Sequence, residues 1–408
     1  MEAHLRSLGT DQHAHLNAMP PGDTAAWLAP RDTKDSSEHH PPHLWRNSLS
    51  TTAESRAAAS TGPNFAVPGE PDAAFYGRLG EAHLAPLWRV PGTDAPEPVV
   101  TDVPHVWHRR DVMALMDEAA TAVDLGGESD RRALNAVNPA RRKGTTHTMI
   151  AGYQLVLPGE TAPAHRHTPS AIRLMLSGSG HTMVEGEPML MNPGDLILTP
   201  GWTWHDHRND GDEPMLWLDA LDVPFVQTMN AQFYEDFPGK QLQPLTQAED
   251  ASTNRYGTGM VPYGTRSATP HSPLTKYPYA ATKEALAKLR VDEGSPQHGV
   301  ELEFTNPLTG GPVLPTMTCG MHLVPAGNAT ITRRHTSSVI FCAVEGAGHT
   351  VIDGERFDWE QHDFFAIPSW STYRHVADEG TDAVLFSMND RPLYEPFGLY
   401  REEREDQS

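Results

Sequence analysis

The stretch "NPGDLILTPGWTWHDHRND" (residues 192–210) joins two turns, a short apolar run and a pair of histidines. Its Asn-Pro-Gly and Pro-Gly steps are typical of turns, and the apolar run between them is typical of a buried strand. His205 and His207 stand two residues apart, so on a strand their side chains point to the same face. Short strands separated by such turns indicate a β-sandwich or a β-barrel.

An earlier stretch, "PAHRHTPSAIR" (residues 163–173), carries a second pair of histidines. On a strand, His165 and His167 share one face while Arg166 points away. Two imidazoles at this spacing are natural neighbouring metal ligands, and His205 can add a third from another strand of the same barrel. The three histidines are therefore the candidate metal ligands.

The spacing of both stretches is that of the two motifs of the cupin barrel. Five residues separate Gly159 from His165, and the second motif is reproduced by Gly194, Pro200, His205 and Asn209. Cupins often carry a Glu ligand four or five residues after the second histidine of the first motif, where this chain has Ala171 and Ile172.

Without that carboxylate, the site would hold three neutral histidines. Such a set leaves three positions of an octahedral metal open for a chelating substrate and dioxygen. Zinc usually stops at four ligands, so we interpret the site as an iron(II) centre.

The same strand-and-turn pattern returns 168 positions later. "SGSGHTMVEGE" (177–187) matches "EGAGHTVIDGE" (345–355), and the register holds from His167/His335 to His207/His375. We therefore predict an all-β bicupin made of two tandem jelly-roll barrels with an N-terminal helical segment. The expected segments are a disordered tail (1–70) with one short helix near 52–59, a helical linking segment (71–144), a first cupin (145–240), a connector with a helix (241–300) and a second cupin (301–400).

Within the linking segment, apolar residues at helical spacing predict an amphipathic helix over 111–123, with Val112, Leu115, Met116 and Ala119 on one face. The tail also contains His13/His15 and His39/His40/His43, but no second motif accompanies them, so we assign them no role.

The second copy of the repeat lacks most of the candidate metal ligands of the first. Arg333 replaces His165, Tyr373 replaces His205, Phe341 replaces Arg173 and Ser387 replaces Asp219. His335 alone matches a ligand, and one imidazole cannot hold a metal. We predict a metal-free second barrel that makes oligomer contacts.

The composition excludes several classes of partner. The formal net charge is -22, which disfavours nucleic acid and anionic membranes, so an anionic substrate needs a local positive centre. Only two cysteines, Cys319 and Cys342, occur, and neither a signal peptide nor a membrane span is apparent. We expect a cytoplasmic protein.

From residue 72 to residue 401 the chain resembles the gentisate 1,2-dioxygenase family, the bicupin ring-cleaving dioxygenases that include salicylate and 1-hydroxy-2-naphthoate dioxygenases. The resemblance rests on "AHRHTPSAIR" and "WTWHDHRNDGDEPMLWLDALDVP". It implies an iron(II) enzyme that inserts dioxygen between the carboxyl-bearing and hydroxyl-bearing carbons of an aromatic substrate. It also implies a homotetramer.

The resemblance further implies roles for individual residues. His207 would act as an acid or base near the bound oxygen, with an ordinary pKa near ~6.5. Arg173 would grip the substrate carboxylate and Asp219 would support the site. Gln154 and Gly152 would line the pocket, and an upstream arginine, Arg131 or Arg132, would read the far side of the substrate.

Several alternatives stay open at this stage. Ile150 stands where the family usually has Trp or Tyr, so the substrate is gentisate, giving maleylpyruvate, or salicylate, a substituted salicylate or 1-hydroxy-2-naphthoate. A non-catalytic binding bicupin and a zinc or nickel isomerase or lyase are the other classes. Asp219 could instead accept bonds from loop amides, and Arg131 and Arg132 could form a solvated charge run with Arg141, Arg142 and Lys143.

Overall fold

The computed structural model describes residues 67, 69–123, 131–266, 269–292 and 299–405. The predicted tail lies outside these residues except for residues 67, 69 and 70, and its short helix and its histidines lie outside them entirely. The chain divides into two compact units at Val90/Pro91. None of the described helices has the length and apolar character needed to cross a bilayer.

The first unit contains helix α2 (Ala73–Glu81) and a short 3-10 turn, η1 (Leu87–Arg89). The guanidinium of Arg89 lies 3.5 Å from the centre of the Tyr76 ring and pairs with Glu70 at 2.6 Å. Tyr76 is buried, whereas Trp88 is 68% exposed. Packing in this unit therefore centres on Tyr76.

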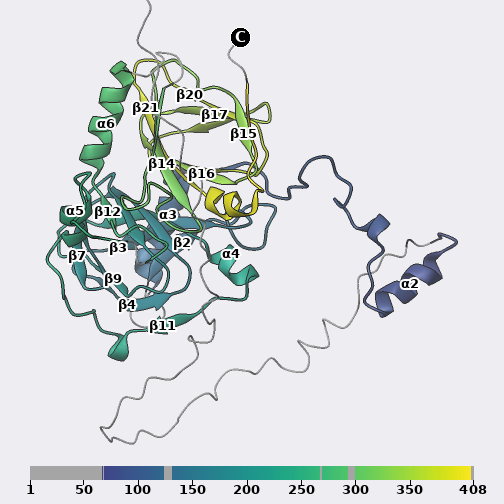
Figure 1. Ribbon diagram of the computed structural model, residues 1–408, viewed down its shortest axis with the longest axis horizontal. Coiled ribbons are helices and arrows are strands. Elements are labelled where there is room, and N and C mark those ends of the chain that lie inside the picture. Colours follow the sequence, from purple (N-terminus) through teal and green to yellow (C-terminus); the bar gives the residue numbers. More distant parts are fainter. Residues whose placement is uncertain (1–66, 68, 124–130, 267–268, 293–298, 406–408) are drawn as a thin grey trace, which may run out of the picture. The chain divides into compact units, whose positions relative to one another are not determined.

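The second unit contains two jelly-roll barrels, each built from two facing antiparallel sheets (Figure 1). In the first barrel, one sheet has the order β12-β8-β5-β10-β3-β2 and the other has the order β11-β4-β9-β6-β7. Their bounds are β2 Arg132–Asn135, β3 Ile150–Val156, β4 Thr161–His167, β5 Ala171–Ser177, β6 Gly180–Val184, β7 Glu187–Met191, β8 Leu196–Thr199, β9 His205–Arg208, β10 Met215–Leu221, β11 Tyr234–Asp236 and β12 Lys276–Tyr277.

In the second barrel the orders are β1-β19-β16-β21-β14-β13 and β18-β17-β20-β15-β22. Their bounds are β1 His105–Trp107, β13 Val300–Glu303, β14 Thr318–Val324, β15 Arg333–His335, β16 Val339–Glu345, β17 Gly348–Ile352, β18 Glu355–Trp359, β19 Phe364–Ile367, β20 Tyr373–Ala377, β21 Ala383–Asn389 and β22 Glu402–Arg404. The helices of this unit are α3 Arg109–Ala122, α4 Val223–Thr228, α5 Ala251–Tyr256 and α6 Tyr279–Asp292, with 3-10 turns η2 Pro238–Lys240, η3 Arg391–Leu393 and η4 Glu395–Phe397.

The predicted segment boundaries need correction, because the two barrels exchange strands. β1 precedes the first barrel in the chain but pairs with β19 of the second, and β12 precedes the second barrel but pairs with β8 of the first. β2 also joins the first barrel although it lies before residue 145. The sequence repeat did not reveal these short strands, because the matched positions begin only with the barrel strands that follow them.

The two helices that follow the exchanged strands each donate a backbone N–H from their first residue to an aspartate, and the two aspartates are equivalent in the repeat. The backbone N–H of Arg109, at the start of α3, donates to Asp363 at 2.7 Å. The backbone N–H of Tyr279, at the start of α6, donates to Asp195 at 2.8 Å. Asp195 and Asp363 are repeat equivalents, so the duplication includes the exchanged strand and helix.

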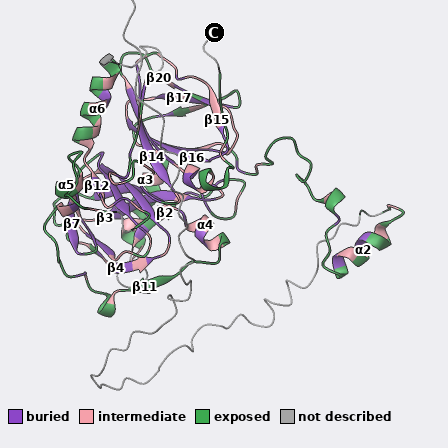
Figure 2. Ribbon diagram, in the orientation of Figure 1, coloured by how far each residue is buried: buried purple, intermediate pink, exposed green. Residues whose placement is uncertain are grey.

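The predicted helix over 111–123 is α3, which buries Met116 completely. Leu115, expected on the same face, is 58% exposed, because it lies about 100° around the helix from Met116. A continuous apolar core joins the barrels, and Tyr153 of β3 packs edge-on against Phe364 of β19 at 5.2 Å. The buried strands of both barrels appear in purple in Figure 2.

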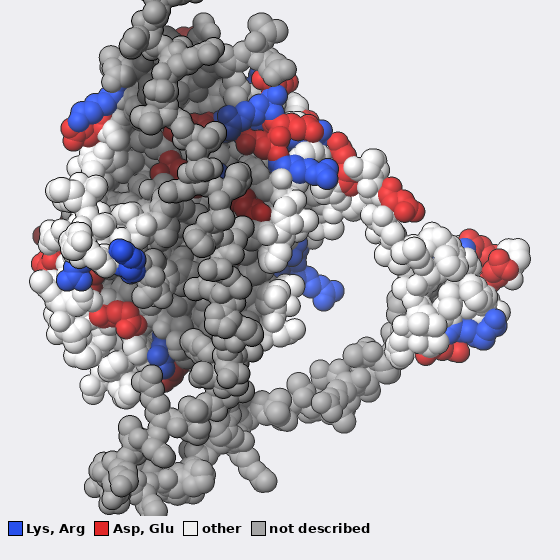
Figure 3. All heavy atoms as spheres, viewed as in Figure 1, with Lys and Arg blue, Asp and Glu red and all other residues white. Residues whose placement is uncertain are grey.

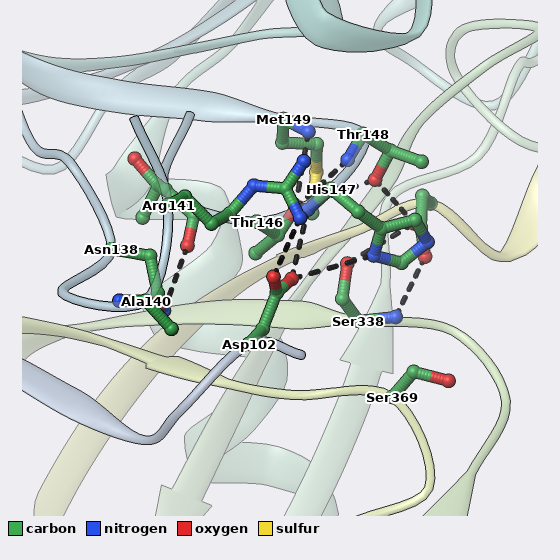
Figure 4. A network of polar contacts seen from close by, with 12 residues as sticks. Asp102, Asn138, Ala140, Arg141, Thr146, His147, Thr148, Met149, Ser338 and Ser369 are labelled. Carbon is green, nitrogen blue, oxygen red and sulfur yellow. Dashed lines mark hydrogen bonds and ion pairs between the residues drawn. The ribbon is translucent and has the colours of Figure 1, made fainter. Parts of the chain in front are cut away.

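A polar network also joins the barrels around His147 (Figure 4). Asp102 pairs with Arg141 at 2.8 Å and lies 3.5 Å from His147 Nδ1. On its other side, His147 Nε2 lies 2.8 Å from the Tyr394 hydroxyl and 3.8 Å from Asp390, both from the second barrel. Burial lowers the pKa of His147, but Asp102 and Asp390 outweigh it and raise that pKa.

We expect this imidazolium to make the fold more stable at mildly acidic pH. Because the folded pKa is raised, the contribution of His147 is complete below the unfolded value of about 6.5 and is lost as pH rises through the folded value. The free energy of unfolding of wild type and of His147→Gln would be measured with denaturant at pH 6 and pH 9. The advantage of wild type over the variant should be larger at pH 6 than at pH 9, by up to about 1 kcal/mol. A difference between the two proteins that is the same at both pH values would contradict this.

Candidate metal centre and cavity

A cavity of about 380 Å³ lies inside the first barrel. Strands of both sheets contribute its walls, so the polar side chains converge from several directions. Its lining residues include Arg131, Asn135, Ile150, Gly152, Gln154, His165, His167, Arg173, His207, Asp219, Val223 and Tyr234.

Three histidines meet at this cavity. His165 and His167 come from β4 and His205 from β9, where His165 and His205 are directly paired across the strands. One ring nitrogen from each lies within 4.8 Å of the others. All three side chains are buried. This confirms that the two distant motifs come together.

The orientation of each ring is fixed by a backbone carbonyl. The Nδ1 atoms of His165, His167 and His205 lie 2.9, 2.7 and 2.9 Å from the carbonyl oxygens of Pro163, Pro169 and Thr203. A proton on each Nδ1 satisfies these carbonyls and leaves the Nε2 lone pair as the acceptor, as in metal-binding histidines generally. The lone pair of His165 faces Arg131, which would give way to a bound metal.

The donor set fits a metal ion. Burial lowers the pKa of His165 to about 3 and that of His167 to about 4, and it lowers the pKa of His205 well below its usual range. The rings are therefore neutral, the form that binds metals. His205 Nε2 is buried and makes no hydrogen bond within the described part of the chain.

Arg131 lies at the cavity, and Arg132 does not. Arg131 Nη1 lies 2.8 Å from His165 Nε2, whereas Arg132 is buried in an ion pair with Glu160 at 2.9 Å. The expectation that Arg132 contacts substrate is therefore wrong. The alternative that Arg131 and Arg132 belong to a solvated run of charged residues is also wrong. Strand alternation explains the difference, since Arg131, Ala133 and Asn135 share the face toward the cavity.

Arg173 and Asp219 form a buried pair on neighbouring strands. They are directly opposite in the ladder of β5 and β10, and Arg173 Nε lies 2.8 Å from Asp219 Oδ1. Arg173 Nη1 also donates to the hydroxyl of Thr199. The pair holds the guanidinium, which is buried, against the cavity wall.

The cavity contains cationic side chains, although the chain as a whole is acidic. The chain carries a formal charge of -22, and on the visible face in Figure 3 acidic and basic side chains are interspersed. Arg131 and Arg173 both line the cavity. They provide the local positive centre that an anionic ligand requires.

His207 lines the same cavity, but its pKa differs from the value expected from the sequence. It is 1% exposed and its ring centre lies 6.1 Å from that of His205. Burial and then Arg173 lower the pKa of His207 well below its usual range, so the ring is neutral near pH 7. The ordinary pKa assumed from the sequence did not include this desolvation.

Strand β3 supplies the floor of the cavity through Ile150, Gly152 and Gln154. A Cβ atom at Gly152 would lie 2.2 Å from the carbonyl oxygen of Leu134, so glycine permits the close approach of β2 that brings Arg131 inward. Gln154 Nε2 is buried and has no partner within the described residues. It can therefore donate to a ligand.

Tyr234 is a cavity residue that the sequence did not reveal. It lies opposite His167 in the ladder of β4 and β11, and its ring stacks on His165 at 5.6 Å. Arg131 lies 5.7 Å from the centre of the same ring. Because β11 has three exposed residues and no alternating pattern, nothing in the sequence marked it as a strand.

The equivalent region of the second barrel holds a different arrangement. Arg333 is paired with Glu301, and His335 Nε2 lies 2.9 Å from the Tyr373 hydroxyl. Phe341 packs against His375 at 4.4 Å. His335 is thus the one imidazole at the three equivalent ligand positions, and its Nε2 contacts the tyrosine.

Residues 152–221 match the family model of the cupin domain, which agrees with the barrel and its histidine set. The chain is 38% identical over 335 residues to gentisate 1,2 dioxygenase 1 of Aquipseudomonas alcaligenes, covering 81% of this chain and 95% of that protein. It is 36% identical over 338 residues to 5-aminosalicylate 1,2-dioxygenase of a Comamonas species, covering 81% and 89%.

Among solved structures, the salicylate 1,2-dioxygenase of Pseudaminobacter salicylatoxidans superposes with a TM-score of 0.77 at 35% identity, covering 84% of this chain and 100% of that one. The same salicylate dioxygenase has also been solved as an adduct with gentisate. Fold and site thus define a cupin dioxygenase. The chain belongs to the gentisate 1,2-dioxygenase family of ring-cleaving dioxygenases.

Proposed function

We propose that this chain is an iron(II)-dependent dioxygenase that cleaves the ring of gentisate, or of a related 2-hydroxy-aryl carboxylate, between the carboxyl-bearing and hydroxyl-bearing carbons. With gentisate, both atoms of dioxygen enter the product, maleylpyruvate. The observation that carries the proposal is the convergence of three neutral imidazoles, two arginines and His207 on one cavity. A homotetramer is part of the proposal and rests on family resemblance. A cytoplasmic location is also part of it and rests on the low cysteine content.

Iron(II), when bound by His165, His167 and His205, supplies open coordination positions for a chelating hydroxy acid and dioxygen, and the redox chemistry that joins them. Arg173 binds the substrate carboxylate through paired, charge-assisted hydrogen bonds, and Asp219 keeps its guanidinium oriented. Arg131 also lines the cavity and adds positive charge there.

His207 takes part in proton transfer from the substrate. A phenolic hydroxyl loses its proton when its oxygen chelates a metal, and the neutral ring of His207 can hydrogen-bond that hydroxyl. Because burial lowers the pKa of His207, the ring would pass this proton on and would not keep it. Gln154 donates its unpaired N–H to an oxygen of the substrate. Gln154, Arg173 and His207 are themselves buried, which strengthens these contacts.

Oxygen consumption tests the function directly. The iron-loaded chain would be given gentisate, salicylate, 5-aminosalicylate and 1-hydroxy-2-naphthoate in air, and ring opening would be followed by absorbance. We expect at least one to support one mole of oxygen uptake per mole of substrate. If none does, the enzyme proposal fails.

Ile150 favours a second candidate, a substrate larger than gentisate, because an aliphatic side chain at the cavity wall leaves room that an aromatic ring would fill. We expect Ile150→Trp to lower kcat/KM for 1-hydroxy-2-naphthoate by about 10-fold more than for gentisate, since the indole would overfill the space beside a second ring. Equal losses for both substrates would show that Ile150 does not set the size limit.

A further inference from the structure

A buried carboxylate connects the second barrel to the metal centre of the first. Asp222 follows β10 and is 2% exposed. Its Oδ2 accepts a hydrogen bond from the hydroxyl of Thr316 at 2.5 Å, and Thr316 belongs to the turn before β14 of the second barrel. Its Oδ1 accepts from the backbone N–H of Ser170 at 2.8 Å.

The contact at Ser170 leads directly to a candidate ligand. The N–H of Ser170 and the carbonyl of Pro169 belong to one planar peptide group, so fixing one fixes the other. That Pro169 carbonyl accepts the bond from His167 Nδ1 at 2.7 Å. Thr316, Asp222 and this peptide therefore form an unbroken series of contacts that sets the orientation of His167.

The duplication gives the second barrel an equivalent series of contacts, in which the roles of the two barrels are exchanged. Asp390 accepts from the backbone N–H of Ser338 at 2.8 Å and from the hydroxyl of Thr148, which belongs to the first barrel. The Ser337 carbonyl of that peptide lies 2.8 Å from His335 Nδ1. Each barrel thus holds the other's aspartate through a threonine, but only in the first does the series end at the candidate metal centre.

We propose that Asp222 and Thr316 are positioning residues for His167, so that the second barrel sets the metal affinity of the first. The proposal rests on the metal centre proposed above. Loss of the Thr316 hydroxyl leaves a buried carboxylate oxygen less satisfied, which loosens the Ser170 peptide and the ring it orients. Outer partners of metal ligands typically contribute about 10- to 100-fold to metal affinity.

The experiment compares Thr316→Val with its repeat equivalent Thr148→Val, with Thr316→Ser as the conservative variant. Iron(II) affinity would be measured anaerobically by competition with a chromophoric chelator, and thermal unfolding would be measured without metal. We expect Thr316→Val to bind iron(II) about 10-fold more weakly. Thr316→Ser should bind like wild type, and Thr148→Val should bind like wild type although it also loses a hydrogen bond between the barrels.

Two results would overturn the inference while leaving the proposed function intact. Wild-type affinity in Thr316→Val would show that the hydroxyl does not position His167. Equal weakening in Thr316→Val and Thr148→Val would show a general loosening of the barrel interface. Failure of the wild-type chain to bind iron(II) would instead remove the metal centre itself, and with it both proposals.

Discussion

Replacing His167 with alanine is expected to abolish metal binding and oxygen uptake. The ring contributes one of three converging nitrogens, and two imidazoles hold a metal much less firmly than three. Since outer partners alone are worth up to about 100-fold, loss of a ligand should weaken iron(II) binding by more than about 100-fold. Metal content after anaerobic reconstitution and desalting measures the effect.

The chain contains its own control for this substitution. His335 is the repeat equivalent of His167, it is similarly buried, and its Nδ1 also faces a carbonyl two residues ahead. We expect His335→Ala to lower stability but to keep the metal content and activity of wild type. If both substitutions reduce metal content equally, the assignment of the centre to the first barrel is wrong.

Replacing Arg173 with methionine is expected to lower kcat/KM by about 10- to 100-fold, the range for a hydrogen bond to a charged group. The substrate carboxylate would lose its charge-assisted partner, a guanidinium that is itself buried. Arg173→Lys keeps the charge but not the planar fork, so its kcat/KM should fall between those of wild type and Arg173→Met.

Arg173→Met also leaves Asp219 buried without its ion-pair partner. Burial already raises the pKa of Asp219, and removing one member of a buried pair destabilises a fold by about 3–5 kcal/mol. The double substitution Arg173→Met/Asp219→Leu removes both charges, so it should regain stability without regaining kcat/KM. Recovery of kcat/KM in the double variant would show that Arg173 acts through folding alone.

Much of the site could be predicted from the sequence because its histidines follow strand geometry. The spacing of His165 and His167 places both on one face, and the second motif places His205 beside them. The repeat could also predict the loss of ligands in the second barrel. These features depend on local alternation and on motif spacing, which the chain itself displays.

The parts that could not be predicted depend on pairing between distant segments. Arg131 and Arg132 are adjacent, and only the register of β2 against β3 shows which faces the cavity. The exchanged strands β1 and β12 have three and two residues, too short for any pattern. The lowered pKa of His207 comes from complete burial, which a linear sequence does not display.

The iron content of the wild-type chain tests the account most directly. The purified chain would be loaded with excess iron(II) without oxygen, desalted, and analysed for iron and protein together. We expect one iron per chain, because His165, His167 and His205 converge and the equivalent positions carry Arg333, His335 and Tyr373. Two irons per chain, or none after loading, would contradict a single three-histidine centre.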